Sequence, residues 1–284
     1  MNEQDYIEFG KLIFHKNILP KDLNISSRQV SYWKSKKLLP NLEYNQHGKM
    51  NILEAIWMSI IKELSDIGIK TQKLEQLSKD VWLKPREEKY ADEVLKYNIN
   101  SKRSKLSKET KADLDRKLND EILMGKLRSE ITPFTDMIKS CLIHKNQPHA
   151  FIYVPETNEH SCHPGDPKLI NELNIFNSDK SIITIPILNK VSKMLSIDFK
   201  SSEKDLKYLS SIENQIRNIV IFKRPKVVEI AFDDNHIKAR KITEKHVRHE
   251  ELADYFVKNK IPKGTKLLID VRSQDNYKLT LITK

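Results

Sequence analysis

The chain has 284 residues, with 50 Lys and Arg against 39 Asp and Glu, a formal net charge of +11, and hydrophobic residue types at 38%. At about 100 to 200 residues per domain, this length predicts two or three domains. Apolar clusters recur along the chain, but none approaches the roughly 18 residues of a membrane-spanning helix. The composition therefore excludes both a membrane protein and a disordered one.

The first ten residues, MNEQDYIEFG, lack the basic and apolar regions of a signal peptide, so we expect a cytoplasmic protein. The chain has two cysteines, Cys141 and Cys162. Two are too few for a disulfide framework, which agrees with a reducing compartment.

The positive charge is concentrated near the start of the chain. Between Lys16 and Lys49, seven basic residues stand against two acidic ones, a local net charge of +5. A basic surface attracts polyanions and releases their counterions. A solvated lysine-rich face would have the same charge, so the arrangement of the residues must decide between the two.

Two consecutive helices are predicted within this basic segment. Residues Ile18 to Asn24 read as a short helix, and after a turn Ser27 to Lys37 read as a second one. Ser26 is a good N-cap and Gln29 follows three residues later, which is the pattern of a capping box. The start of the second helix is therefore well specified.

The second helix has two different faces. Val30 and Trp33 share one side at the spacing of a buried stripe. The opposite side carries Arg28, Tyr32, Ser35 and Lys36. Such hydrogen-bond donors read base edges and bind phosphates when a helix enters the major groove.

The next segment reads as a hairpin followed by two more helices. The hairpin, a candidate wing, is LEYNQHGKMN with Gly48 in its turn. Asn51 then caps a third helix, with Glu54 completing the capping box, and Gly68 ends it. A fourth helix is predicted from about Thr71 to Trp82.

In this order, the run NISSRQVSYWKSKKLLP, the glycine-containing wing and LSDIGIKTQKLEQL resemble the winged helix-turn-helix of the MerR family of bacterial transcription regulators, over about residues 16–83. The resemblance implies double-stranded DNA binding by a recognition helix at 27–37 and a wing at 42–50. It also implies a homodimer on an inverted repeat, which distorts promoter DNA and so alters the binding of RNA polymerase. The expected DNA-binding residues are Arg28, Gln29, Ser31, Tyr32, Ser35, Lys36, Lys37 and Lys49.

The sequence departs from the family pattern at two places. Ser31 stands where the family usually has a second Arg, and the wing reads Gly48, Lys49, Met50 in place of Gly, aromatic, Arg. These departures weaken the implied phosphate contacts but leave the implied fold unchanged.

Two other classes of function stay open. One is an architectural, excision-type accessory DNA-binding factor of a phage or mobile element, and the other is a winged-helix protein-interaction module. The long C-terminal half favours regulation. An enzyme is not expected, because the chain has no Walker loop, no GxGxxG and no GxSxG motif. No cofactor is expected either, and Asp233 and Asp234 fit a hairpin turn.

The middle of the chain is predicted to connect two domains. Residues 84–109 read as a charged linker, and from Leu114 to Ile131 apolar residues repeat at helical spacing as one amphipathic helix. This stripe is a candidate dimerisation helix, as the MerR resemblance implies. Alternatively it packs on the chain's own C-terminal domain. Thr132 and Pro133 read as the start of a further helix to about His144.

The C-terminal half, residues 132–284, is predicted to be an α+β sensor or assembly domain with a small-molecule effector. HAFIYV, SIITIPIL, KMLSIDF, NIVIF and KVVEIAF read as strands, and DLKYLSSIENQIRN as a helix. Residues 132–222 are similar in part to a GAF domain. In a second interpretation the half resembles a GyrI-like domain, with a small ββαββ module at 226–284. The expected fold class is thus multidomain, an all-α winged helix-turn-helix domain followed by an α+β domain.

One group of residues has the chemistry of a metal site. It consists of Cys141, His144, His149, His160, Cys162 and His163. Thiolates and imidazoles bind Zn or Cu. Their spacing fits no zinc finger and there is no CxxC, so we expect no metal site here.

Overall fold

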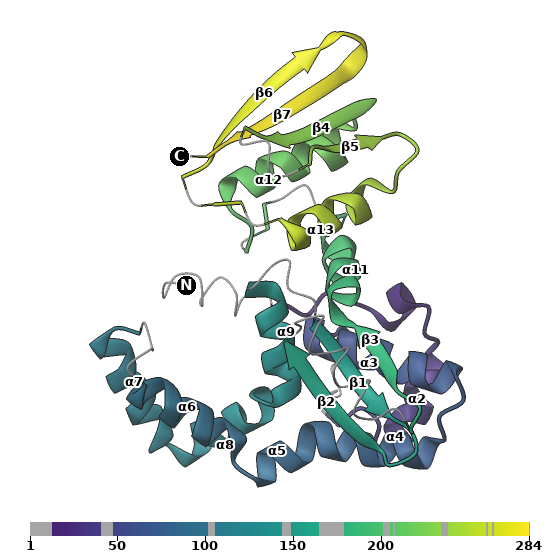
Figure 1. The fold of residues 1–284 in the computed structure, drawn as a ribbon, viewed down its shortest axis with the longest axis vertical. Coiled ribbons are helices and arrows are strands. Elements are labelled where there is room, and N and C mark those ends of the chain that lie inside the picture. The colour runs from purple at the N-terminus through teal and green to yellow at the C-terminus, as the bar shows by residue number, and fades with distance from the viewer. Residues whose placement is uncertain are drawn as a thin grey trace. The chain divides into compact units, whose positions relative to one another are not determined.

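The computed structural model describes residues 13–40, 48–101, 106–143, 149–164, 179–200, 205–206, 208–233, 238–259, 261–262 and 264–283. The chain forms two compact units, Met1–Ile187 (unit 1) and Leu188–Lys284 (unit 2). Each unit combines helices with one small sheet, which confirms a mixed α and β architecture (Figure 1). In the described ranges, no helix has the length and apolarity needed to cross a bilayer. The domain boundaries expected at residues 83 and 131 stay predictions.

Unit 1 begins with short helices. They are the 3₁₀-helix η1 (Pro20–Leu23), α2 (Ser27–Ser35), α3 (Ile52–Asp66), α4 (Thr71–Ser78) and the π-helix η2 (Lys79–Leu83). Of these, α2, α3 and α4 start where the sequence predicts, whereas the first begins at Pro20 and not at Ile18, and the predicted fourth helix continues after Ser78 as a π-helix. The predicted capping boxes of Ser26 and Asn51 are both present. Ile18 forms an isolated antiparallel bridge with Met50, which holds the segments before η1 and α3 together.

The predicted linker and the predicted single connector helix are both wrong. Residues 84–101 form α5 (Lys84–Glu87) and α6 (Tyr90–Asn100). The apolar stripe is divided between α7 (Lys108–Leu118) and α8 (Glu121–Glu130), because Asp120 accepts hydrogen bonds from the first backbone amides of α8 and so starts a new helix. Four residues of the stripe pack on a buried cluster from α6 and α8 in the same chain: Leu114, Leu118, Leu127 and Ile131 against Ala91, Leu95 and Met124.

An aromatic core holds the rest of unit 1 together. Trp57 of α3, Trp82 of η2, Phe134 of α9 (Pro133–Ile143) and Phe151 of β1 (His149–Val154) meet edge to face, with ring centroids 5.3 to 6.1 Å apart. Every residue of β1 is buried. It lies between its antiparallel neighbours β2 (Glu159–Pro164) and β3 (Ile183–Pro186). Through these contacts α3 and η2 pack on α9 and on a sheet whose strands come much later in the sequence.

Unit 2 packs helices on a four-stranded sheet in the order β5-β4-β7-β6. Its elements are α11 (Ile187–Phe199), α12 (Ser211–Arg217), the π-helix η3 (Asn218–Lys223), β4 (Val227–Phe232), β5 (Arg240–Thr243), α13 (Arg248–Lys258), β6 (Lys266–Arg272), the 3₁₀-helix η4 (Ser273–Asp275) and β7 (Asn276–Ile282). The predicted order of two strands, a helix and two strands is present in β4, β5, α13, β6 and β7. Strands β4 and β7 pair in parallel, and the other two pairings are antiparallel.

Two segments predicted as strands are helical instead. KMLSIDF belongs to α11, where Ile187, Val191 and Met194 are buried at helical spacing. NIVIF continues α12 as η3, which buries Ile219 and Val220. Both segments are short and rich in apolar residues, which is compatible with either structure, and tertiary packing decides.

Candidate nucleic-acid interface

Helix α2 turns one face into the core and the other to solvent. Trp33 is 4% exposed, whereas Tyr32 beside it is 48% exposed. All eight predicted DNA-binding residues are exposed: Arg28, Gln29, Ser31, Tyr32, Ser35, Lys36, Lys37 and Lys49. The predicted solvent face of α2 is therefore confirmed, whereas of the predicted core stripe Trp33 is buried and Val30 is only half-buried.

Two of these eight residues already use their side chains inside the helix. The Gln29 Oε1 atom accepts a hydrogen bond from the Ser26 backbone amide at 2.9 Å. The Ser35 hydroxyl donates to the carbonyl oxygen of Tyr32 at 2.7 Å. Gln29 therefore stabilises the start of α2 and Ser35 its last turn.

The end of α2 is a Schellman motif with an unusual residue in it. The backbone amide of Leu38 donates to the Trp33 carbonyl at 2.9 Å, and that of Lys37 to the Lys34 carbonyl at 3.0 Å. This motif requires a left-handed residue, usually Gly, directly after the cap. Here it is Lys37, with φ of 57°. The backbone of a residue that has a side chain is strained in this conformation, and the chain carries a lysine there nevertheless.

The segment after α2 is fixed by two side-chain hydrogen bonds. The Leu38 carbonyl accepts from Trp57 Nε1 at 2.8 Å and from the Ser78 hydroxyl at 3.1 Å. Both donors are buried and belong to α3 and α4. The chain that leaves the end of α2 is thus anchored to α3 and α4, the two helices that follow it.

One flank of α2 carries Arg28, Tyr32 and Lys36, which lie four residues apart on one line. The Tyr32 hydroxyl is 3.3 Å from the Thr71 hydroxyl at the start of α4. The Lys36 ammonium lies 5.9 Å from the centroid of the Tyr32 ring. The Tyr32 side chain is therefore positioned by Thr71 of α4 and by the Lys36 ammonium.

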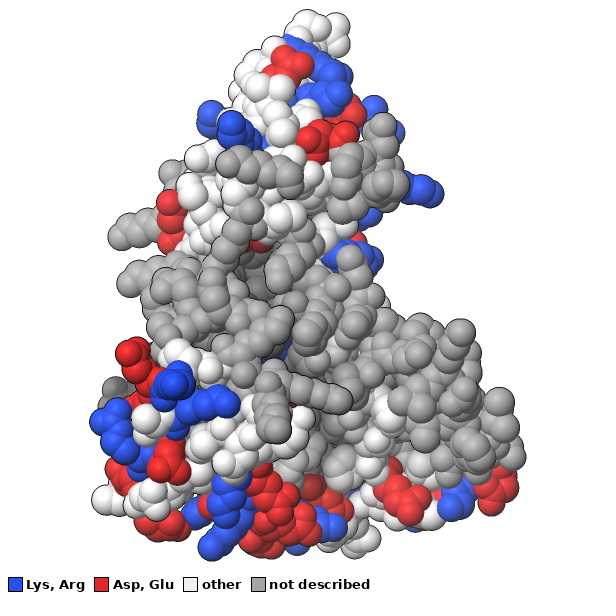
Figure 2. All heavy atoms as spheres, turned by 60° about the vertical axis from the view of Figure 1, so that its left-hand side comes forward, with Lys and Arg blue, Asp and Glu red and all other residues white. Residues whose placement is uncertain are grey.

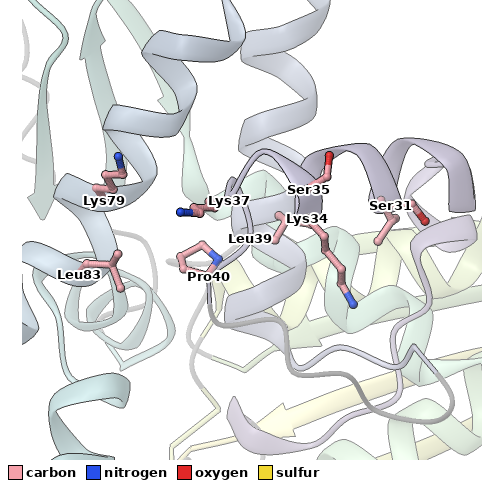
Figure 3. A pocket seen from close by; sticks show the side chains of 9 residues that line it. Ser31, Lys34, Ser35, Lys37, Leu39, Pro40, Lys79 and Leu83 are labelled. Carbon is pink, nitrogen blue, oxygen red and sulfur yellow. The ribbon is translucent and has the colours of Figure 1, made fainter.

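The other flank of α2 borders a pocket of about 490 Å³. Figure 3 shows Ser31, Lys34 and Ser35 of α2 on one side and Lys79 and Leu83 of η2 on the other. Three of the nine lining residues are lysines, and none is acidic: Val30, Ser31, Lys34, Ser35, Lys37, Leu39, Pro40, Lys79 and Leu83. Of the lysines, Lys79 also pairs with Glu75 at 3.3 Å. The flank combines ammonium groups with serine hydroxyls, which are phosphate ligands in many DNA complexes.

The charged residues of α2 itself are of one sign. From Asn24 to Pro40 the chain has no acidic residue. By contrast, Lys and Arg are interspersed with Asp and Glu on the face shown in Figure 2, toward which α6, α7 and α8 of Figure 1 are turned. There, Asp113 pairs with Arg116 and Lys117, and Arg128 with Asp92 and Glu121. A surface of mixed signs cancels its own field, whereas the residues of α2 itself contribute only positive charge.

The predicted wing lies mostly outside the described residues, which omit 41–47. Its last residues are described: Gly48 has φ of 60°, Lys49 is exposed and Met50 is fully buried. The positive φ explains why a glycine occupies position 48. Lys49 thus stands at the surface, next to a residue anchored in the core.

The Cys and His residues suspected of binding a metal do not all point the same way. In β2, Cys162 and His163 are neighbours on a strand and so face opposite sides of the sheet. His160 stacks on Phe151 at 5.9 Å between centroids, and His144 lies outside the described residues. Burial raises the pKa of the Cys141 and Cys162 thiols to about 12. In the described ranges no three His, Cys, Asp or Glu residues come together as metal ligands.

Three residues of this surface are missing from the sequence prediction. Lys34 has a sequence signal, because it lies midway between Ser31 and Lys37 on one helical flank. Thr71 and Lys79 are about forty residues away along the chain, and only the packing of α4 and η2 beside α2 brings them here.

In comparisons with family models, with curated proteins and with solved structures, nothing matches this chain.

Proposed function

We propose that this protein is a DNA-binding transcription regulator of the MerR type, which reads double-stranded DNA with α2 and with a wing at 42–50. The observation that carries the proposal is the exposed, acid-free face of α2, built on a buried Trp33. The bridge from Ile18 to Met50 and the capped starts of α2 and α3 support a winged helix-turn-helix.

The two flanks of α2 take different parts in this proposal. Arg28 points outward from the first turn of the helix, the part that reaches base edges when a recognition helix enters the major groove, and Tyr32 lies about one turn further along the same side. The lysines around the pocket, Lys34, Lys37 and Lys79, bind backbone phosphates and fix the helix in register. This division predicts that the first flank sets sequence preference and the second sets salt dependence.

The test is titration of duplex DNA with the full chain at several salt concentrations, followed by fluorescence anisotropy. Arg28→Ala should weaken binding to a selected site by about 1 to 3 kcal/mol and relax sequence preference. Lys79→Ala should weaken binding to all sequences alike and lower the salt slope by about one. Lys96→Ala, an exposed lysine of α6, is the matched control. A full chain that binds no duplex even at low salt would refute the proposal and leave a protein-interaction module.

We extend the proposal to a homodimer on an inverted repeat and to regulation of RNA polymerase at promoters, with unit 2 as the effector-binding part. Mapping of the bound sites by chromatin immunoprecipitation separates this from the excision-type alternative, which requires binding at attachment sites. Sedimentation of the full chain, free and on DNA, measures the stoichiometry.

A further inference from the structure

A second pocket, of about 380 Å³, lies within unit 2, and it is lined by basic and apolar residues alone. We call it the α13 pocket. Its residues come from the end of α11, from η3 and its cap, and from the start of α13: Lys200, Ile221, Phe222, Arg224, His246, Val247, Arg248 and His249. Three separate segments thus bring five nitrogen-bearing side chains to one hollow.

The cations of the α13 pocket have no carboxylate partners within ion-pair distance among the described residues. Arg248 donates to the carbonyls of Val220, at 3.4 Å, and Pro225, at 2.6 Å. Arg224 donates to the carbonyl of Ile221 at 3.2 Å. These bonds orient the two guanidinium groups, and no carboxylate of the described residues forms an ion pair with either, although Glu244 and Asp275 lie near enough to Arg248 to favour its charged form.

Elsewhere in unit 2 the exposed arginines are paired. Arg240 bridges Glu251 and Asp254, and Arg272 lies 3.8 Å from Glu229. Arg224 and Arg248 of the α13 pocket therefore differ from these two arginines in having no ion pair with a described carboxylate. Concave, partly desolvated surfaces strengthen the field of such groups and attract anions.

The remaining polar groups of the pocket are also donors. The Thr243 backbone amide donates to His246 Nδ1 at 3.0 Å, so Nε2 of that ring holds the proton and is free to act as a donor in this tautomer. Burial, and then the neighbouring Lys200, lower the pKa of His249, while Glu250 acts in the opposite direction. The neutral form of His249 is therefore favoured mainly by its burial.

The backbone at Arg224 strengthens the case. Its φ is 51°, in the left-handed region where glycine is favoured. Arg224 is the cap of η3, and the chain carries an arginine at this strained position, where it lines the pocket. Phe222 beside it lines the pocket and also packs on the buried guanidinium of Arg217, at 4.9 Å.

We propose that the α13 pocket binds a small organic phosphate, in which the phosphate is held by Arg224, Arg248 and Lys200 and an apolar group lies on Ile221, Phe222 and Val247. Arginine forks match the oxygens of a phosphate dianion. The volume exceeds that of a phosphate alone and lies near the lower end of the range for small-molecule sites. The inference deepens the effector part of the proposed function and rests on it only for its regulatory consequence.

The experiment is isothermal titration calorimetry of the full chain with phenyl phosphate at constant ionic strength. We expect binding of phenyl phosphate, weaker binding of inorganic phosphate and no binding of phenol. Arg224→Ala and Lys200→Ala should each weaken phenyl phosphate binding by about ten-fold, since each removes a charge-assisted contact. Lys223→Ala is the matched control, because this exposed lysine adjoins Arg224 but does not line the pocket.

Absence of phenyl phosphate binding at millimolar concentration overturns the inference, and so does binding that Arg224→Ala leaves unchanged. A short DNA duplex distinguishes the source of the phosphate. Displacement of phenyl phosphate by saturating duplex would assign the pocket to the DNA backbone and overturn a small-molecule site. A protein that binds phenyl phosphate but no DNA would uphold this site while refuting the proposed function.

Discussion

Lys37 offers a test in which stability and DNA binding should change in opposite directions. It occupies the left-handed position of the Schellman motif that ends α2, with φ of 57°. A left-handed L-residue costs about 1 to 2 kcal/mol. Glycine removes that strain, but it lowers the free energy of unfolding by about 0.5 to 1 kcal/mol because it has more conformational freedom in the unfolded chain. Lys37→Gly should therefore raise the free energy of unfolding by about 0.5 to 1 kcal/mol.

The assay is urea unfolding of the full chain followed by tryptophan fluorescence. The three tryptophans, Trp33, Trp57 and Trp82, all belong to unit 1, so the signal reports the unit that contains the mutation. DNA binding is then measured at several salt concentrations. If Lys37 binds a phosphate, the slope of log K against log salt falls by about 0.9.

Two further variants separate strain from charge. Lys37→Asn removes the charge while keeping a residue that tolerates the left-handed region, and Lys37→Ala removes the charge while keeping the strain. The reasoning fails if Lys37→Gly lowers stability, because the backbone would then not be strained. It also fails if all three variants bind DNA with unchanged affinity and salt slope.

Three other predictions concern unit 1. Trp33→Ala should lower the free energy of unfolding by about 3 to 5 kcal/mol, as expected for a core aromatic, and a loss below about 1 kcal/mol in urea unfolding would contradict its burial. The Arg128 guanidinium, hydrogen-bonded to Asp92, lowers the pKa of that carboxyl. The pair is therefore fully stabilising above the unfolded pKa, near 4, and its contribution is lost as pH falls through the lowered folded value. Arg128→Ala should destabilise unit 1 at pH 7, and unfolding curves at pH 7 and pH 3 should differ less than in the wild type. Cys141, fully buried with its pKa raised to about 12, should resist iodoacetamide at pH 8 until urea unfolds the chain, and rapid labelling of the native protein would show that the site opens.

The sequence by itself determined the local features of the candidate site. The capping boxes of Ser26 and Asn51 mark where α2 and α3 begin, because a cap is a contact between residues three apart. Burial of Trp33 and exposure of Tyr32 follow from the helical period. The strands β1, β4, β5, β6 and β7 were also predictable, since each is short, apolar or alternating, and bounded by turn residues.

Tertiary structure decided the rest. The run KMLSIDF became a helix and not a strand, because so short a segment does not distinguish the two periods and its structure depends on what it packs against. The charged segment 90–100 became α6, because Ala91 and Leu95 find an apolar partner in Met124. Lys79 and Thr71 reached the candidate interface only through the fold of α4 and η2. Such contacts between distant parts of the chain leave no periodic signal in either segment, and only the packed structure brings them together.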